Sequence, residues 1–310
     1  MAARASLIED GGSAASDEEN FFRSPQFLQA EGVTHTLTIE LAGEELRVPL
    51  IVREIEGSER VDAISPYGYP GASGASGAPP QPAEIDWAQT GLVSLFLRDR
   101  IGEPPTLGGG TARSEVQLAE DESGIRKRLR EQIRRNERRG WLVESRPGPE
   151  VDAAALEGFE AAYAETMTRT GAAQRYLFST DYFRTILASP RSWLLLASRE
   201  RGPATAGAIA VASDGLLHYF LGGTADQALD DSPMKNLFAA MIALAREQGL
   251  PLNLGGGVTP GDSLDSFKRG FATATARFRT HEVVCDPAAY EELSAGIDAE
   301  GFFPAYRAGA

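Results

Sequence analysis

Apolar and polar positions along the first third of the chain follow the two-residue alternation of β-strands. Residues 34–41 and 46–55 are rich in β-branched side chains, and residues 42–45 between them predict a hairpin. Residues 91–99 contain few polar positions, which predicts a buried strand. The same pattern predicts further strands at 61–65, 114–118 and 141–145.

The second half alternates helical and strand patterns. An amphipathic helix is predicted from apolar residues at helical spacing, namely Leu156, Phe159, Tyr163 and Met167. Strands are then predicted at 192–198, 206–213 and 216–223. Asp214-Gly215 joins the last two as a hairpin.

A second helix is predicted within residues 230–249, before a strand at 250–257. Ser232 suits the N-cap, Pro233 the first helical position and Gly249 the end of the helix. Mixed strands and helices in this order indicate an α/β fold class with mixed, α+β-type sheets.

Glycine, proline and serine divide the chain. Residues 71–82 form a low-complexity loop, and the Pro- and Gly-containing residues 146–152 place the predicted domain boundary near 147–151. Residues 1–20 are acidic, lack the apolar core of a signal peptide and are predicted to be disordered.

Composition narrows the class of protein. Cys285 is the single cysteine, so no intramolecular disulfide forms and a zinc cluster is not expected. No run of about 18 apolar residues occurs, which predicts no membrane span. The single cysteine favours the reducing cytoplasm, and no residues occur at metal-ligand spacing, so a bound metal is not expected.

The charge is unevenly distributed. The whole chain carries −14, yet residues 126–139 carry +6, which leaves −20 on the remainder. Ile125, Leu129 and Ile133 form a narrow apolar stripe on this basic segment, which predicts a helix ending at Gly140. Because salt screens each charge within about 10 Å, such a local patch can bind an anion on an acidic molecule.

Several motifs, in their order, resemble the FemABX-type aminoacyltransferases of the GNAT acyltransferase superfamily. The matching stretches are LHYFLGGT, SPMKNLF, AREQG, LNLGGG and SFKRGF in the second half, with SPYGYPG and RRNERRGW before them. The resemblance covers roughly residues 20 to 290. The coiled-coil arm of some family members has no counterpart here.

The resemblance implies two tandem GNAT-like domains with an inter-domain cleft. The expected domains are 21–150 and 151–282, with 283–310 returning to the first domain. The implied activity transfers an amino acid from aminoacyl-tRNA to an amine acceptor in a peptidoglycan precursor or a natural-product peptide. Aminoacyl-tRNA is then a co-substrate and partner, and no cofactor is required.

The donor has an alternative in acyl-CoA. Many GNAT enzymes hold the CoA pyrophosphate in a glycine-rich loop before the central helix. Here that loop carries Asp226, Asp230 and Asp231, whose carboxylates would repel pyrophosphate. The acidic loop is equally unfavourable for tRNA at that position. An N-acyltransferase using acetyl-CoA or another acyl-CoA stays open, as does a non-catalytic GNAT-like binding module.

The resemblance points to Lys268 and Phe267 as catalytic residues in the Phe-Lys-x-x-Phe motif. Acyl transfer needs a cation near the developing oxyanion, and Lys268 would supply it or bind phosphate. A solvated surface lysine is the alternative. Asp262 would orient the incoming ammonium, as would Asp265, or Asp262 caps the helix that bears Lys268. Backbone approach to the substrate, or a tight turn, is expected at Gly255, Gly256 and Gly257.

Two further groups complete the candidate site. Tyr67 and Tyr69 would line an acceptor pocket beside residues 71–77, which would close as a lid, or they are packing residues. Phosphate contacts to tRNA or a nucleotide-linked acceptor are expected from the basic helix, or its charge is simply solvated. These contacts would come from Arg134, Arg135, Arg138 and Arg139. His218 is predicted to be a core residue.

Overall fold

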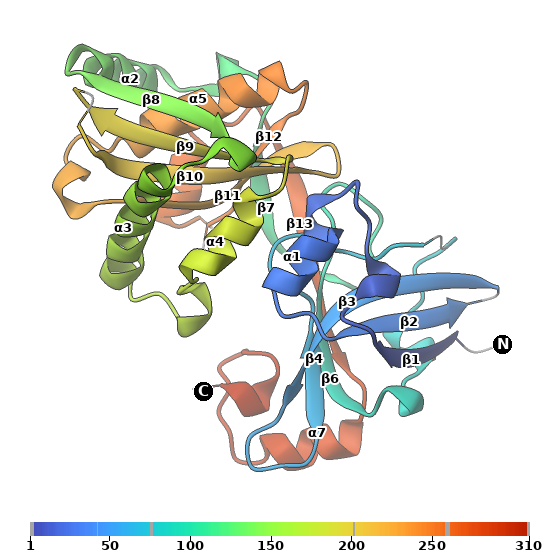
Figure 1. Cartoon of the computed structure of the whole chain (residues 1–310). Helices are drawn as coiled ribbons and strands as arrows, with labels where there is room; N and C mark the ends of the chain where they lie inside the picture. The colour runs from blue at the N-terminus through green and yellow to red at the C-terminus, as the bar shows by residue number, and fades with distance from the viewer. Residues whose placement is uncertain (1–2, 42, 75–76, 201, 258–260, 309–310) are drawn as a thin grey trace. The chain divides into compact units, whose positions relative to one another are not determined.

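The fold is known from a computed structural model of the chain (Figure 1). It describes residues 3–41, 43–74, 77–200, 202–257 and 261–308. The chain divides into two compact units: Met1–Arg113 with Arg277–Ala310 forms the first, and Ser114–Ala276 forms the second. The fold class is mixed α/β, as the sequence predicts.

The division falls at residue 113, not near 147–151. Strand β8 (Trp141–Pro147) pairs along its whole length with β9 (Ser192–Arg199). The Pro- and Gly-containing stretch is therefore a turn inside the second unit that leads into α3 (Ala153–Thr170). Proline and glycine mark tight turns as readily as linkers, which explains the misplaced boundary.

The first unit is built on a mostly antiparallel sheet. Its strand order is β5-β1-β2-β3-β4-β6-β13, in which β1/β5 and β4/β6 pair parallel. The strands are β1 (Ala3–Glu9), β2 (His35–Leu41), β3 (Glu44–Glu54), β4 (Val61–Ile64), β5 (Ile85–Asp86), β6 (Leu92–Arg98) and β13 (Ala274–Val284). The helices are α1 (Pro25–Ala30) and α7 (Pro287–Ser294). The strands predicted in this region are confirmed; Ala42 of the predicted hairpin lies outside the described residues.

The prediction of disorder at residues 1–20 is wrong. Residues 4–9 of β1 pair with β2, and Ala3 and Ala5 are buried under the sheet. The sequence pattern of β1 is weak because its buried positions are alanines, which add little hydrophobicity. The acidic residues that follow make the segment resemble a disordered one. Residues of η1 (Ser13–Ala15), with Ala15 buried, continue the ordered structure.

A buried carboxylate, that of Asp62 on β4, contacts residues near the C-terminus within the first unit. The Asp62 side chain is 0% exposed and accepts hydrogen bonds from Arg53 Nε at 2.9 Å and Arg307 Nε at 2.6 Å. The Tyr306 hydroxyl also donates to Asp62, at 3.2 Å. A buried carboxylate with several charged donors holds its partners far more strongly than an exposed pair does.

Asp62→Ala should therefore lower the free energy of unfolding by about 3 kcal/mol, because both arginines lose a buried partner. Glu292→Ala is the matched control, since Glu292 pairs with Arg60 on the surface and its loss should cost about 1 kcal/mol or less. Urea denaturation of both variants measures the difference. Equal effects of the two substitutions would contradict this role of Asp62.

The second unit contains the strand order β7-β12-β11-β10-β9-β8. Its remaining strands are β7 (Thr111–Ala119), β10 (Ala204–Ser213), β11 (Leu216–Thr224) and β12 (Leu252–Gly255). Its helices are α2 (Lys127–Arg138), α3, α4 (Thr180–Leu187), α5 (Met234–Glu247) and α6 (Ser263–Lys268). The predicted basic helix, central helix and hairpin at Asp214-Gly215 are confirmed.

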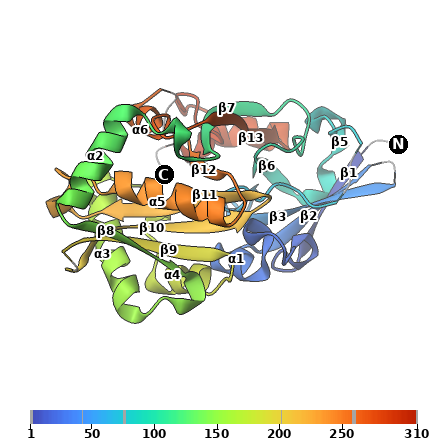
Figure 2. The same cartoon turned by 90° about the horizontal axis from the view of Figure 1, so that it is seen from above.

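Helices cover both faces of this sheet (Figure 2). α3 packs on β10 and β11 from one side, where Gly223 lets the α3 backbone approach so closely that a Cβ would lie 2.5 Å from the Tyr163 Cα. α5 packs on the other face through Leu237, Phe238 and Met241, and α2 packs on α5. The central helix is thereby fixed against the sheet.

The start of α5 differs from the prediction. Pro233 occupies the N-cap, and no side chain caps the helix. Ser232 has φ 50°, in the left-handed region, so its side chain is not in the capping position that the sequence predicts. Gly249 follows the last turn with φ 69°, which confirms the predicted end.

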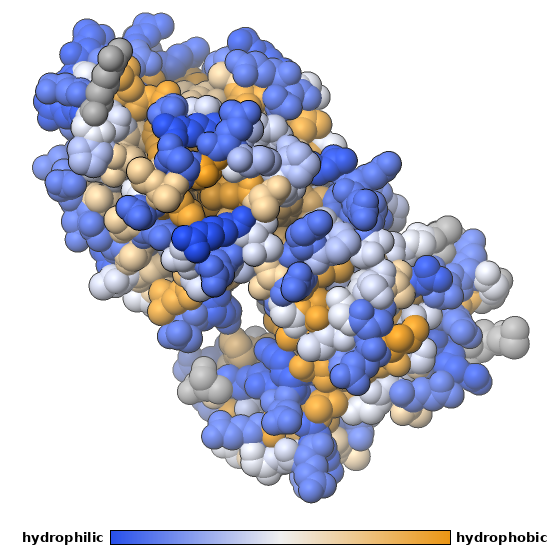
Figure 3. All heavy atoms as spheres, in the orientation of Figure 1, coloured by the Kyte–Doolittle hydropathy of each residue, from blue (hydrophilic) through white to orange (hydrophobic). Residues whose placement is uncertain are grey.

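Hydrophilic side chains cover most of the face shown in Figure 3, with smaller apolar areas between them. Among the described residues, none of the helices combines the length and the apolar character needed to cross a bilayer.

Candidate functional site

A fork between two parallel strands defines the candidate site in the second unit. β11 and β12 pair only at Leu217 with Leu252 and at His218 with Asn253. Beyond these pairs β11 continues to Thr224, whereas β12 ends at Gly255. Where two parallel strands separate, their backbone N–H and C=O groups no longer pair with each other. Another element must then supply hydrogen-bond partners and fill the space between the strands.

Lys268 at the end of α6 reaches into this fork. Its Nζ donates a hydrogen bond to the Gly256 carbonyl at 2.8 Å and lies 5.5 Å from the centre of the Tyr219 ring. The residue is only 6% exposed, so the alternative of a solvated surface lysine is wrong. A buried lysine needs compensation, and the carbonyl and the ring face supply it.

Burial lowers the pKa of the Lys268 ammonium to about 8, while the carboxylates of Asp262 and Asp265 act in the opposite direction. Burial also raises the pKa of the neighbouring Tyr219 hydroxyl to about 12, so that group stays protonated. The ammonium of Lys268 is thus the titrating cation of the fork near neutral pH.

The glycines at the end of β12 make room for Lys268. Gly255 has φ +75°, and a Cβ placed there would lie 3.1 Å from the Lys268 Nζ. Gly256 supplies the carbonyl, and Gly257 is half-buried after it. The glycine run therefore serves a tight turn next to the lysine; contact of all three glycines with substrate stays a prediction.

Asp262 is the N-cap of α6, where its side chain accepts from the Asp265 backbone N–H at 2.7 Å. Asp265 is buried and accepts from Gln117 Nε2 on β7 at 3.1 Å and from Arg269 at 3.0 Å. These bonds fix α6 and so the direction of Lys268. A role of Asp262 in binding the acceptor stays a prediction.

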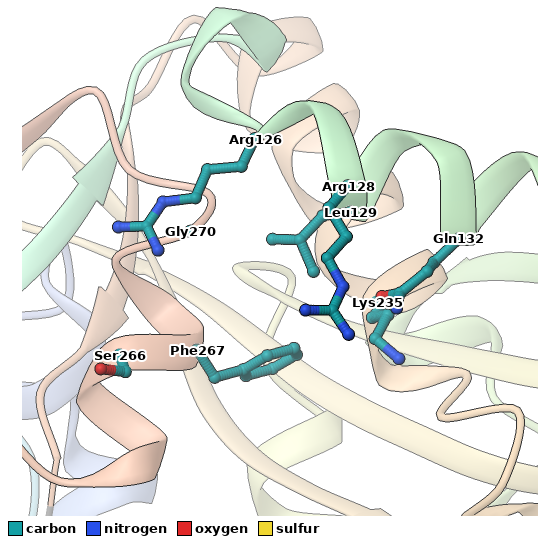
Figure 4. Close-up of a pocket in the computed structure, with 8 residues that line it drawn as sticks. All are labelled: Arg126, Arg128, Leu129, Gln132, Lys235, Ser266, Phe267 and Gly270. Carbon is teal, nitrogen blue, oxygen red and sulfur yellow. The ribbon is translucent and has the colours of Figure 1, made fainter.

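Phe267 lies on the other side of α6, facing α5. Its ring packs 5.3 Å from Phe238 and 5.4 Å from Phe271. It also lines a pocket of about 280 Å³ between α2, α5 and α6 (Figure 4). The lining residues are Arg126, Arg128, Leu129, Gln132, Lys235, Ser266, Phe267 and Gly270.

Three cations, Arg126, Arg128 and Lys235, line this pocket. In Figure 4 the guanidinium of Arg128 points toward the Phe267 ring, and Lys235 lies beside it. Burial, together with the positive charges of Arg135 and Arg128, lowers the pKa of Lys235. Within the described part of the chain, Arg128 and Lys235 form no ion pair, so their charge is available to an anion.

The residues that line this pocket include none of the four arginines predicted to bind phosphate. Arg139 pairs with Asp231 at 2.6 Å. Arg134 and Arg138 are exposed and absent from the lining, whereas Arg135 affects Lys235 electrostatically. Sequence reasoning missed Arg128 and Lys235. The signal was present, because Arg128, Gln132 and Arg135 follow helical spacing along one face of α2.

Two of the three carboxylates before α5 have partners. Asp226 pairs with Arg169. Asp231 accepts from Trp141 Nε1 at 3.0 Å and pairs with Arg139, and these contacts lower the pKa of its carboxyl. The loop therefore repels an anion less than the sequence indicates.

Tyr67 and Tyr69 belong to the first unit. The Tyr69 ring packs 5.6 Å from Phe22 and 5.1 Å from Phe278, as part of an aromatic cluster. The Tyr67 backbone N–H donates to Glu31 at 2.8 Å. Packing thus accounts for Tyr69, and an acceptor role for both tyrosines stays a prediction. Residues 75–76 of the predicted lid lie outside the described residues.

The stability of the protein should report the ionisation of Lys268. Its pKa falls from 10.5 when unfolded to about 8 when folded, so the unfolded chain binds more protons between these values. Relative to Lys268→Met, the wild type should gain up to about 3 kcal/mol of stability as pH rises from 8 to 10.5.

Lys127→Met is the matched control, because Lys127 is exposed on α2 and its removal should leave the pH dependence unchanged. Urea denaturation at several pH values measures all three proteins. Parallel curves for the wild type and Lys268→Met would contradict the lowered pKa.

Comparison with known proteins identifies the fold. Residues 123–269 match the acetyltransferase (GNAT) domain family. Among proteins with curated descriptions, none matches the sequence. The matched segment contains the fork, α6 as far as Lys268 and the basic pocket apart from Gly270.

Solved structures match over both units. The FemX crystal structure has 14% identity over 83% of this chain and 89% of that chain, with a TM-score of 0.56. L-PGS from Bacillus licheniformis has 14% identity over 84% and 87%, with a TM-score of 0.57. The C-terminal domain of an Agrobacterium fabrum protein assigned as a lysylphosphatidylglycerol synthetase has 15% identity over 86% and 87%, with a TM-score of 0.55. These similarities confirm the expected GNAT-type fold.

Proposed function

We propose that this chain, whose residues 123–269 match the acetyltransferase (GNAT) domain family, transfers an aminoacyl group from aminoacyl-tRNA to an amine. The match to this family supports acyl transfer on a GNAT-type fold, and the aminoacyl donor is the finer part of the proposal. The observation that carries it is the buried Lys268 ammonium in the strand fork. The likeness to FemX and to a protein assigned as a lysylphosphatidylglycerol synthetase supports an aminoacyl donor.

The reaction forms one C–N bond and breaks one ester C–O bond. A neutral amine attacks the aminoacyl ester carbonyl, whose oxygen becomes negative in the tetrahedral intermediate. The C–O bond to the terminal ribose then breaks, and a proton from the amine ends on the released hydroxyl. Stabilising the negative oxygen is the largest contribution a protein makes to such a reaction.

Lys268 has the properties that this contribution requires. With a pKa of about 8, most of the side chain is an ammonium at pH 7, and it can donate a hydrogen bond to the oxyanion. Lys268 is 6% exposed, and its Nζ lies 5.5 Å from the centre of the Tyr219 ring, so little water reaches it. An ammonium acts more strongly on a nearby oxyanion where water is excluded.

The pocket between α2, α5 and α6 supports a donor that carries phosphates. Arg128 and Lys235 supply positive charge, and the Phe267 ring supplies a surface on which a base can stack. Phe267 and Lys268 are neighbours in sequence, so the pocket and the fork meet at α6. One donor can then place its phosphates in the pocket and its ester near Lys268.

The acceptor in this proposal is an amine on a peptidoglycan precursor or a peptide. Asp262 would attract the ammonium form of the acceptor. An aminoacyl-tRNA donor would place the reaction in the cytoplasm. Incubation with mixed charged tRNAs and candidate amines should consume aminoacyl ester; unchanged ester with every amine would count against an aminoacyl-tRNA donor.

Lys268→Met should lower kcat by about 100-fold or more, because the oxyanion loses its cation. Its melting temperature at pH 7 should not fall, since the substitution also removes a buried charge. Single-turnover transfer and thermal denaturation measure the two effects. A lower melting temperature with normal transfer would instead assign Lys268 a structural role.

Arg128→Ala and Lys235→Ala should each weaken donor binding and reduce the slope of log affinity against log salt by about one. Arg138→Ala is the matched control on the same helix, because Arg138 is exposed outside the pocket. Binding of a charged minihelix RNA at several salt concentrations measures the slopes. Equal losses in all three variants would favour a diffuse helix surface over the pocket.

Acyl-CoA is a second candidate donor, because the pairing of Asp226 and Asp231 removes much of the repulsion against pyrophosphate. Both donors carry phosphates and an activated acyl carbon, and both would use Lys268. A thermal shift with CoA esters distinguishes them: stabilisation by acetyl-CoA with no effect of charged minihelix would favour this alternative.

A further inference from the structure

Two buried polar side chains lie at the vertex of the strand fork. His218 on β11 and Asn253 on β12 form the last residue pair before the strands separate. Both are 1% exposed. Asn253 Nδ2 lies 3.0 Å from His218 Nδ1, and His218 Nε2 lies 3.2 Å from the Ser213 carbonyl oxygen.

The hydrogen bonds at the two ends of the pair define one protonation state. The Ser213 carbonyl can only accept, so His218 Nε2 carries a hydrogen. The Asn253 side-chain oxygen accepts from the Gly255 N–H at 2.8 Å, which turns its amide nitrogen toward His218 Nδ1. That nitrogen only donates, so Nδ1 is the acceptor and the imidazole is neutral.

Burial maintains the neutral imidazole. It lowers the pKa of His218 to about 4, against weaker contributions from the Ser213 carbonyl and Asp214 that favour the charged form. At neutral pH the ring therefore acts as a fixed donor and acceptor, not as a proton carrier.

Asn253 connects this pair to Lys268. Its bond to the Gly255 N–H closes a turn two residues long, in which Gly255 takes φ +75°. The next carbonyl, of Gly256, is the acceptor of the Lys268 Nζ. The continuous series is Ser213, His218, Asn253, the Gly255–Gly256 turn and Lys268.

We propose that Asn253 and His218 are positioning residues that hold the Gly255–Gly256 turn and thereby set the place of the Lys268 ammonium in the fork. Neither touches the reacting atoms: His218 fixes the orientation of the Asn253 amide, and Asn253 fixes the turn. This assignment rests on the proposed function only for the statement that Lys268 acts in acyl transfer.

Other charged or titratable groups near Lys268 act in both the wild type and the variants. They are Asp262 and Asp265 on its own helix and Tyr219 on β11. Arg269 pairs with Asp265 and Glu115. Because these groups are unchanged by substitution of His218, a change at Lys268 reports the turn.

The first test needs no variant. The chain has three histidines, so long-range proton–nitrogen NMR spectra resolve each ring. His218 is expected as the neutral form with hydrogen on Nε2 between pH 6 and 8. A ring protonated at pH 6, or one with its hydrogen on Nδ1, would overturn the assignment.

The second test compares His218→Gln with His218→Leu. A glutamine amide can still accept from Asn253 and donate to Ser213, whereas leucine can do neither. The chain has three lysines, so selective ¹³C labelling gives three signals, assigned with lysine-to-arginine variants. Titration then measures the pKa of Lys268 directly, without any transfer assay.

His218→Leu should let the turn open and admit water, which raises the pKa of Lys268 from about 8 toward 10.5. It should also lower kcat on the order of 100-fold, with the donor KM unchanged. His218→Gln should restore both values. A Lys268 pKa equal in the two variants, or equal losses of kcat, would overturn the proposal. If the wild type shows no transfer activity but the pKa of Lys268 still differs between the wild type and His218→Leu, the proposed reaction is refuted and the positioning role is kept.

Discussion

The site depends on one buried hydrogen bond, from the Lys268 ammonium to the Gly256 carbonyl. A lysine 6% exposed would be very costly without a polar partner, so the turn, the fork and α6 must agree in position to within a fraction of an ångström. Gln117 and Arg269 hold the carboxylate of Asp265, and Asp262 caps the same helix. These contacts on α6 therefore keep the Lys268 Nζ within hydrogen-bonding distance of the Gly256 carbonyl oxygen.

The use of cations divides the second unit into two environments. Arginine serves where charge must persist, as in the pairing of Arg139 with Asp231 and of Arg169 with Asp226. Lysine, whose pKa responds to burial, occupies the fork, and it lines the pocket beside the fork together with Arg126 and Arg128. The net negative charge of the whole chain does not predict the local charge of the fork or of the pocket. Which ions each of them can bind depends on the local arrangement of paired and unpaired charges.

The sequence predicts most strands and helices, because the spacing of apolar side chains differs between the two. The strands at 206–213 and 216–223 are examples. It fails where small residues carry the pattern, as in β1, and where proline and glycine mark a turn within a unit. The motif that contains Lys268 can be recognised in the sequence. The pairing of Asp226 with Arg169 cannot, because the two residues lie 57 positions apart. The same holds for His218 and Asn253, since their separation of 35 residues closes only when two strands pair.

The scarcity of lysine bears on the proposed acyl transfer. Three lysines stand among thirty basic residues, and of these Lys268 is buried, Lys235 is half-buried and Lys127 is exposed. Guanidinium groups are poor nucleophiles because they stay protonated, whereas free amines attack esters. Because arginine takes most of the basic positions, the chain offers few side-chain amines that an activated ester of the proposed reaction could acylate.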